Sequence, residues 1–264
     1  MKRVYNLRVK RIPSDRLNYI TLSPKIALPD VVDLRNKMPP IYDQGQLGSC
    51  TANALAAAFD YERKKSTSVE TWLNPSRLFI YYNERKIEHD IPDDAGAQIS
   101  DGVLALEKYG CCAESLWDYN IRLFAEKPTD SAYKAASLHR VLKAQHVKQD
   151  ILSMRTALAA AYPFVVGISV YDSFETDAVA ASGRVPMPNK KKESLLGGHA
   201  VVCVGYDNPS ERWIMRNSWG TMWGVDGYFT LPYEYLVDQS LCSDLWKICV
   251  EQNLPDDKKN ALIK

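Results

Sequence analysis

The sequence predicts an α+β protein of two lobes, with a helical first half and a β-rich second half. Apolar residues recur with helical spacing after Cys50, and similar patterns follow over 76–86 and 101–109. From residue 163 onward the apolar segments are short and β-branched, which is typical of strands. With 264 residues, 46% of them hydrophobic, the chain is long enough to bury a full core.

The first helix begins after a polar, glycine-broken loop that ends at Ser49, and we expect it to run from Cys50 to about Lys65. A cysteine at this junction lies where unpaired backbone N–H groups and the helix dipole favour a thiolate. Gln44, six positions upstream, carries an uncharged amide that is suited to donate to a developing oxyanion. On this stretch alone, a buried structural thiol behind an ordinary turn is an equal alternative.

Capping residues place the next helices. Asn74 followed by Pro75 predicts an N-cap and a first helical residue. Ser100 is a suitable cap for the third helix, and Gly110 is suited to end it. The second half is expected to hold a helix over 151–161 and strands over 163–171, 200–206, 212–217 and 227–231.

Two motifs near the end of the chain supply a base and an amide. His199 stands at the start of an apolar, β-branched strand, and Asn217 follows the next strand within Asn-Ser-Trp-Gly. In papain-like cysteine proteases the histidine and asparagine follow the nucleophilic cysteine by roughly 130–150 residues. The order of Cys50, His199 and Asn217 makes this sequence resemble the papain-family (C1, cathepsin-like) cysteine peptidases, from about Pro29 to about Val250.

The resemblance implies a two-lobed papain-like fold with the active-site cleft between the lobes. A helical lobe is expected over about 40–120 and a β-rich lobe over about 121–250, together forming a peptidase domain over 29–250. Cys50 would then lie on one wall of the cleft and His199 on the other. Residues 1–28 form an N-terminal extension, and residues 251–264 form a C-terminal tail.

The family's chemistry implies a cysteine endopeptidase that hydrolyses peptide bonds through an acyl-enzyme. Cys50 would be the nucleophile, and His199 would take its proton to give a thiolate–imidazolium pair. Asn217 would orient the imidazole, Gln44 and the Cys50 N–H would form the oxyanion hole, and Trp219 would shield the His–Asn bond. No metal and no organic cofactor is implied.

Substrate-binding residues are carried over from the family's motifs. Gly96 and Ala97 fall in the loop that binds the substrate backbone. Gly167 aligns with the floor of the main specificity pocket, and Ala200 lines its wall. Because these side chains are small, we expect a roomy pocket that prefers a bulky apolar or aromatic residue two places before the scissile bond.

Thr51 departs from the family, which usually has tryptophan after the nucleophile. The helix then continues with Ala52, Asn53 and Ala54 in place of bulkier residues. These two departures affect substrate preference more than chemistry. Leu47 stands where secreted relatives usually have a cysteine in a disulfide, which fits reduced thiols. Two alternatives remain at this point: a catalytically weak or inactive binding protein, and an amidase or acyl transferase on the same scaffold.

Charge and composition give no indication of a nucleic-acid or membrane partner. The chain has 33 basic and 32 acidic residues. No apolar run approaches the roughly 20 residues of a membrane span, and the N-terminus lacks the apolar core of a signal peptide. We expect an intracellular, cytoplasmic monomer that acts on protein or peptide substrates. The six cysteines are expected to be reduced, with Cys242 and Cys249 the pair most suited to an exception.

Two further expectations concern segments outside the motifs. Residues 1–28 are expected either to pack on the surface as an extra strand or to block the cleft as a short gating segment. Asp93 and Asp94 predict a solvated loop and not a metal pair. His139 and His146 have no metal-ligand spacing, so we expect both on the surface.

Overall fold

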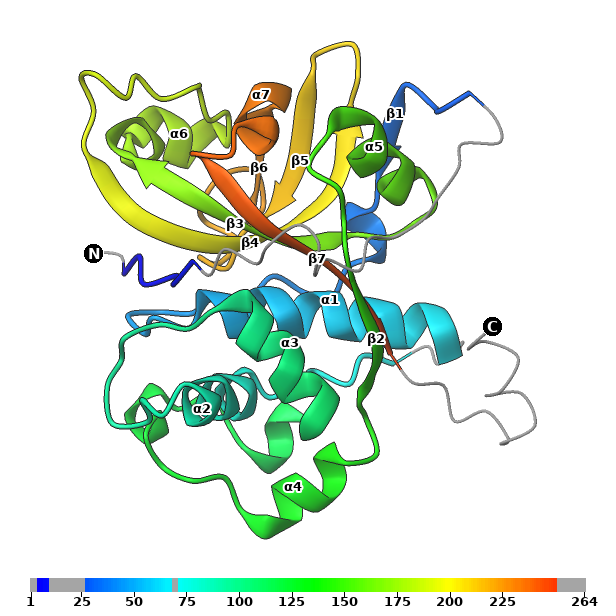
Figure 1. Ribbon diagram of the computed structural model, residues 1–264, viewed down its shortest axis with the longest axis vertical. Helices are drawn as coiled ribbons and strands as arrows, with labels where there is room; N and C mark the ends of the chain where they lie inside the picture. The colour runs from blue at the N-terminus through cyan, green and yellow to red at the C-terminus, as the bar shows by residue number, and fades with distance from the viewer. Residues whose placement is uncertain (1–3, 10–26, 68–70, 251–264) are drawn as a thin grey trace.

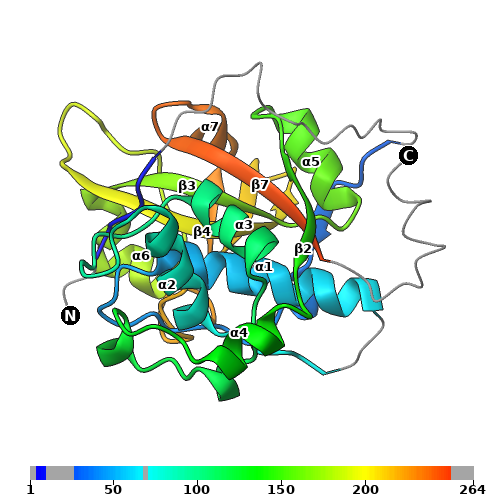
Figure 2. The same cartoon turned by 60° about the horizontal axis from the view of Figure 1, so that its bottom comes forward.

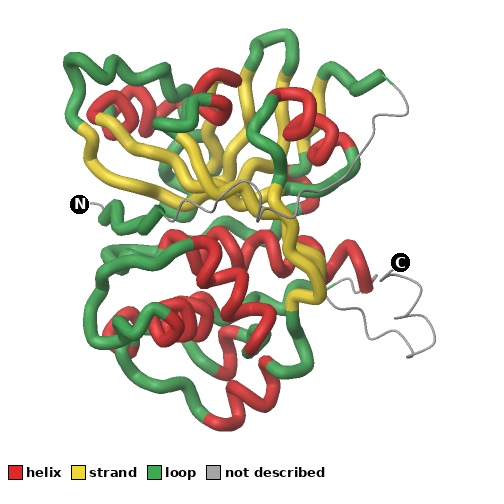
Figure 3. The backbone as a smooth tube through the Cα atoms, in the orientation of Figure 1, coloured by secondary structure: helices red, strands yellow, loops and turns green. Residues whose placement is uncertain are grey.

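The computed structural model describes residues 4–9, 27–67 and 71–250, and it has the α+β architecture that the sequence predicts. Helices form one lobe and an antiparallel sheet forms the other, with the helical lobe below the sheet in Figure 1. Figure 3 separates the lobes by the colour of their helices and strands. Helix α1 (Cys50–Thr67) lies along the junction and contacts both lobes.

Helix α1 is buried on nearly all sides because small side chains allow both lobes to approach it. Ala52, Ala56 and Ala57 have no exposed surface, and Leu55 and Phe59 are equally buried. The polar side chains buried with them are bonded inside the core, as Thr51 is to Glu84 and Asp60 is to Arg63. The position of Cys50 is therefore fixed by a rigid, fully packed element.

Helix α2 (Arg77–Ile87) has Ser76 as its N-cap, so the prediction of Asn74 as the cap is wrong. The Ser76 hydroxyl accepts the backbone N–H of Phe79 at 3.1 Å, which satisfies one unpaired donor of the first turn. Asn74 has a left-handed φ of 50°. The Asn-Pro pair therefore shapes the approach to the helix, and the serine two residues later starts it.

Helix α3 (Ile99–Lys108) begins earlier than expected. Gln98 is its N-cap and makes no side-chain capping bond, while Ser100 lies inside the first turn, so the prediction of Ser100 as the cap is wrong. Gly110 follows the helix with a φ of 76° and allows the chain to turn away, as expected.

The remaining helices are α4 (Asp130–Ala136), α5 (Ile151–Ala159), α6 (Asp177–Ser182) and α7 (Tyr233–Val237). Helix α4 belongs to the helical lobe, because Ala132 and Ala136 pack against Phe79. That lobe therefore continues past the expected boundary at residue 120. Helices α5, α6 and α7 lie with the sheet in the upper lobe (Figure 1).

A seven-stranded sheet forms the β-rich lobe, in the order β2-β7-β3-β4-β5-β6 with β1 beside β4. Every strand pair in it is antiparallel. The strands are β1 (Val31–Asp33), β2 (Val141–His146), β3 (Phe164–Tyr171), β4 (Leu195–Asp207), β5 (Arg212–Arg216), β6 (Tyr228–Pro232) and β7 (Cys242–Val250). Strand β4 extends beyond both ends of the predicted strand.

Strands β2 and β7 were missed by the sequence analysis. They pair with each other and run side by side past α1 (Figures 1 and 2). His146 on β2 is buried against Trp246 with ring centres 3.7 Å apart, so the prediction of a surface position for His146 is wrong. Burial lowers the pKa of His146 to about 4.

The six cysteines are all free thiols. Cys242 and Cys249 lie near opposite ends of β7, so they do not form the disulfide considered as an exception. In the ranges 4–9, 27–67 and 71–250, no helix is long and apolar enough to cross a membrane. Nor do the His, Cys, Asp and Glu side chains of those ranges gather in a group that could hold a metal ion.

Candidate active site

Cys50 is the first residue of α1, at the end of a loop that is braced by the helical lobe. Arg77 donates from Nη1 to the carbonyl oxygen of Asp43 at 3.0 Å. The Tyr119 hydroxyl donates to the carbonyl oxygen of Gln44, also at 3.0 Å. Both bonds hold the start of the loop, and the Tyr119 hydroxyl also lies 2.6 Å from Ser49 Oγ, next to Cys50 at its other end.

Asp94 braces the same loop from the opposite side, so the prediction that it is a solvated residue is wrong. Its carboxylate accepts the backbone N–H of Gly48 at 3.0 and 3.1 Å and the hydroxyl of Tyr81 at 2.5 Å. Asp93 is exposed, as expected. A carboxylate that accepts a buried hydroxyl and a backbone N–H stabilises the conformation of the loop.

His199 and Asn217 form a buried pair in the β-rich lobe. His199 lies in β4, where it is opposite Ile168 of β3, and Asn217 directly follows β5. His199 Nε2 lies 2.8 Å from Asn217 Oδ1, which also accepts the backbone N–H of Ser218 at 2.8 Å. Since that oxygen can only accept, Nε2 carries the proton and Nδ1 is the basic nitrogen of the neutral ring.

Gln44 connects the two lobes beside this pair. Its Oε1 accepts the Ser218 hydroxyl at 2.7 Å, and its backbone N–H donates to the Ser218 carbonyl oxygen at 2.9 Å. Its Nε2 donates to the carbonyl oxygen of Leu47 at 3.0 Å. An amide nitrogen carries two hydrogens, so one donor remains for an oxygen atom in the site.

Trp219 covers the histidine. Its ring stacks on His199 with centres 4.8 Å apart and planes 23° apart. Trp223 packs edge-on behind it, with a centre-to-centre distance of 4.8 Å. The indole thus excludes water from one face of the imidazole.

The thiol of Cys50 lies at the strand that carries the histidine, where the backbone amide of Ala200 favours its thiolate. Ala200 directly follows His199, so Cys50 and His199 meet at the same point between the lobes. Cys50 is only 1% exposed, and burial raises the pKa of its thiol to about 12 although the backbone N–H groups of Ala200 and Thr51 favour the thiolate.

Residues 4–9 lie between the two lobes, across this site and not on the outer surface (dark blue in Figure 1). Asn6 pairs with Gly198 as a parallel bridge, and the Leu7 N–H donates to the Gly198 carbonyl oxygen at 3.1 Å. Tyr5 packs edge-on against His199, with ring centres 6.1 Å apart. The extension therefore does not add an outer strand here, while residues 10–26 are outside the described part of the chain.

Arg8 fixes the other end of this segment to the helical lobe. Its backbone N–H donates to the Ala97 carbonyl oxygen at 3.0 Å. Its guanidinium forms ion pairs with Glu88, at 2.9 Å, and with Asp90, and Nε donates to the Ala95 carbonyl oxygen at 3.1 Å. Tyr5 and Arg8 thus lie at opposite ends of the covered cleft.

The predicted substrate-binding residues surround this segment. A Cβ on Gly96 would overlap with the Asn6 carbonyl oxygen, so only glycine allows so close an approach of the two backbones. A Cβ on Gly167 would lie 2.7 Å from Leu7 Cδ2, and Gly167 is opposite Ala200 in the sheet. Gly96, Ala97, Gly167 and Ala200 therefore line one continuous path, and Trp219 lies at its end beside Tyr5.

Sequence reasoning missed the residues that position the site. Ser218, Tyr119 and Asp94 act through hydrogen bonds to a loop that is distant from them in the sequence. Ser218 had a local signal, because it lies between Asn217 and Trp219. Tyr119 and Asp94 had none, since only the tertiary fold brings them to the loop.

Comparison with known proteins identifies the family. Residues 28–242 match the profile of the papain family cysteine proteases. An uncharacterized peptidase C1-like protein of Acanthamoeba polyphaga mimivirus is 42% identical over 214 residues, which cover 78% of this chain and 68% of that protein.

Solved structures agree in fold. Xylellain, a cysteine protease from Xylella fastidiosa, superimposes with a TM-score of 0.85 at 42% identity, covering 94% of this chain and 96% of that one. Digestive procathepsin L 3 of Tenebrio molitor larval midgut has a TM-score of 0.70 at 21% identity, covering 89% and 73%, and shows the fold alone. The chain therefore belongs to the papain family of cysteine proteases and is a peptidase.

Proposed function

We propose that this peptidase is an endopeptidase in which Cys50 is the nucleophile and His199 is the general base. The observation that carries the proposal is the meeting of the Cys50 thiol with the strand of His199, whose ring is oriented by Asn217 at 2.8 Å. A nucleophile, a base and a group that orients the base form a catalytic triad.

The reaction follows from these contacts. His199 Nδ1 takes the thiol proton as Cys50 attacks the peptide carbonyl carbon. The Gln44 amide and the Cys50 backbone N–H stabilise the oxyanion of the tetrahedral intermediate. The imidazolium then protonates the leaving amine, and water hydrolyses the resulting thioester with His199 again acting as the base.

The position of Leu7 against Gly167 supports a preference for substrates with a bulky apolar side chain. Leu7 reaches Gly167, and Ile99 lies beside the same point, 3.6 Å from where a Cβ on Gly167 would be. We infer that a leucine or aromatic side chain of a substrate occupies this pocket. Gly167→Val would fill it, and the KM for a leucine-containing peptide should rise much more than that for an alanine-containing one.

We also propose that residues 4–9 gate the cleft. The segment uses the Gly198 and Ala97 carbonyl oxygens and the Gly167 pocket, which are the groups that a substrate would need. Its ion pairs at Arg8 are partly exposed, so the segment is held by modest interactions and is able to leave. Leaving would rehydrate Cys50 and lower the pKa of its thiol.

The intact mass after treatment with an epoxysuccinyl inhibitor tests both proposals, with Cys50→Ala as the control. We expect slow formation of one adduct on the full chain, fast formation after deletion of residues 1–9, and none on the control. Equal rates before and after the deletion would contradict the gate. Absence of an adduct on both forms would contradict the catalytic role of Cys50.

A further inference from the structure

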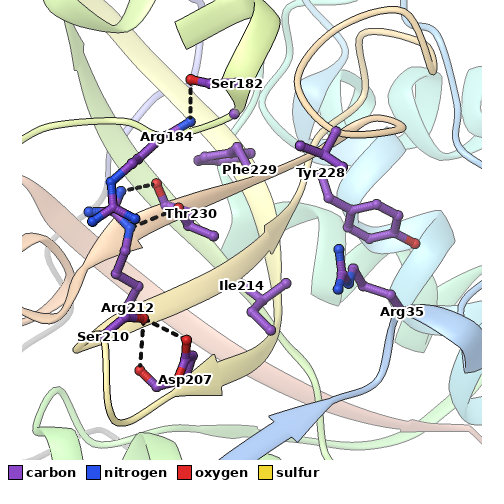
Figure 4. Close-up of a pocket in the computed structure, with 12 residues that line it drawn as sticks. Arg35, Ser182, Arg184, Asp207, Ser210, Arg212, Ile214, Tyr228, Phe229 and Thr230 are labelled. Carbon is purple, nitrogen blue, oxygen red and sulfur yellow. Dashed lines mark hydrogen bonds between the residues drawn. The ribbon is translucent and has the colours of Figure 1, made fainter.

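A second cavity lies in the β-rich lobe, between the end of α6 and the strands β4, β5 and β6. It has a volume of about 300 Å³ and is distinct from the covered cleft. This volume is in the lower part of the range for small-molecule sites and is far larger than a water requires. Figure 4 shows its lining, with the side chains of Arg184 and Arg212 next to each other on one flank.

Arg212 is a buried cation that no carboxylate neutralises among the described residues. It is 7% exposed, and its Nε donates to Thr230 Oγ1 at 2.8 Å. Its Nη2 donates to the carbonyl oxygens of Val185 at 2.5 Å and Thr230 at 2.7 Å. These acceptors are neutral, so they hold the guanidinium in place without compensating its charge.

Arg184 adds a second positive charge to the same flank. Its side chain is exposed and forms no ion pair within the described ranges. Burial, and in second place repulsion from the guanidinium of Arg184, lowers the pKa of Arg212 to about 10. Two adjacent cations without a counter-charge are an unfavourable arrangement that an anion would relieve.

The rest of the lining defines what kind of anion fits. Asp207, with Ser210 bonded to its Oδ2 at 2.7 Å, lies at the end of the cavity away from the two guanidinium groups (Figure 4). Arg35 on the other side is already paired with Asp33 at 2.7 Å. Ile214 and Phe229 provide an apolar wall between these ends.

We propose that this cavity binds a phosphate group through Arg184 and Arg212. Arg184 presents a planar pair of donors that matches the oxygen atoms of a phosphate, and Arg212 adds the donors of Nη1, because its Nε and Nη2 hydrogens are already bonded. The phosphate could be the free ion or part of a small phosphate monoester, whose organic part would lie on the Ile214 and Phe229 wall. This inference does not depend on the peptidase mechanism.

Isothermal titration of the full chain with inorganic phosphate and with phenyl phosphate, at matched ionic strength in chloride, tests the proposal. We expect the titration to give one site per chain. In a separate thermal unfolding experiment, a phosphate concentration ten times the dissociation constant should raise the melting temperature by about 3–6 °C. Tighter binding of phenyl phosphate would identify a monoester as the ligand class, and equal binding would identify the free ion. Absence of binding by both probes would overturn the proposal.

Two variants distinguish binding of phosphate in this cavity from general attraction of an anion to a positively charged surface. Arg184→Gln should weaken binding by about tenfold or more, whereas Lys191→Gln, which removes an equal charge from an exposed position outside the cavity, should not. Asp207→Asn should strengthen binding, because it removes the negative charge from the cavity. Equal effects of Arg184→Gln and Lys191→Gln would overturn the proposal, and unchanged inhibitor labelling of Cys50 in Arg184→Gln would show that the variant is folded.

Discussion

The two lobes hold their parts of the candidate site by different means. In the β-rich lobe, His199 is positioned by the backbone register of β4, and Asn217 by the end of β5. In the helical lobe, Cys50 is the first residue of the packed helix α1, whereas Gln44 lies on the preceding loop, which is held by side-chain hydrogen bonds from Arg77, Tyr119 and Asp94. The candidate base is therefore fixed by main-chain pairing, while the amide donor of Gln44 depends on single side chains.

The largest expected effect is loss of the base. His199→Ala should lower kcat/KM for a fluorogenic peptide by roughly 10⁴-fold or more. The variant has no base to remove the thiol proton and no acid to protonate the leaving amine. The backbone register of β4 should persist, so the melting temperature should change little. His139→Ala is the matched control, since His139 is outside the site and should leave kcat/KM unchanged. A comparable loss in that control would contradict the assignment of the base.

Loss of the oxyanion donor ranks second. Gln44→Ala should lower kcat by about 10²–10³-fold with little change in KM, because the amide acts on the charge that develops during attack. Ser218→Ala should lower kcat less, by about tenfold, because it removes only the hydrogen bond that the Ser218 hydroxyl donates to Gln44 Oε1. A larger effect of Ser218→Ala than of Gln44→Ala would show that the bond between the lobes, and not the amide donor, is what matters.

The lobes should also differ in the pH dependence of their stability. Glu84 in α2 is fully buried, accepts the Thr51 hydroxyl at 2.7 Å, and has a pKa raised to about 8 by burial. The folded state then binds more protons than the unfolded state between about pH 4 and 8, so the free energy of unfolding decreases as the pH rises, by at most about 1.4 kcal/mol per pH unit. His146 in β2 has a lowered pKa and should act in the opposite direction, increasing stability as the pH rises from about 4 to 6.5.

Urea unfolding between pH 7.5 and 8 reports mainly on Glu84, because His146 is then almost entirely neutral in both the folded and the unfolded state. The decline in stability over this range should be shallower in Glu84→Gln, whose amide still accepts the Thr51 hydroxyl. His139→Gln is a suitable control in the same assay. Parallel declines in the wild type and Glu84→Gln would contradict a protonated Glu84 in the folded state.

The smallest expected effect concerns the bond between the extension and the helical lobe. Arg8→Gln should speed inhibitor labelling of Cys50 by up to about fivefold, because partly exposed ion pairs contribute at most about 1 kcal/mol. Added salt should have a similar effect on the wild type and little on the variant. Arg122→Gln, an exposed arginine in another part of the helical lobe, should label at the wild-type rate.

Much of the fold could be predicted from the sequence, because the signals are local. The start of α1 at Cys50 follows from the change from a polar loop to an alanine-rich pattern, and Gly110 ends α3 through its own backbone freedom. Strand β3 was predicted to within one residue because its apolar, β-branched run is continuous. Strands β2 and β7 lack such a run, since Lys143 and Lys247 interrupt the apolar residues in them.

The sequence by itself predicted the residues of the proposed chemistry, because the order of Cys50, His199 and Asn217, with Gln44 before them, follows from residue types and spacing. Only the tertiary structure decided that Asp94 braces the nucleophile loop and that residues 4–9 cross the cleft. The physical reason is how far apart in the sequence the interacting residues lie. A helix start or a strand depends on neighbours in the chain, whereas a carboxylate meeting a distant N–H, or a leucine filling a distant pocket, depends on how the two lobes pack.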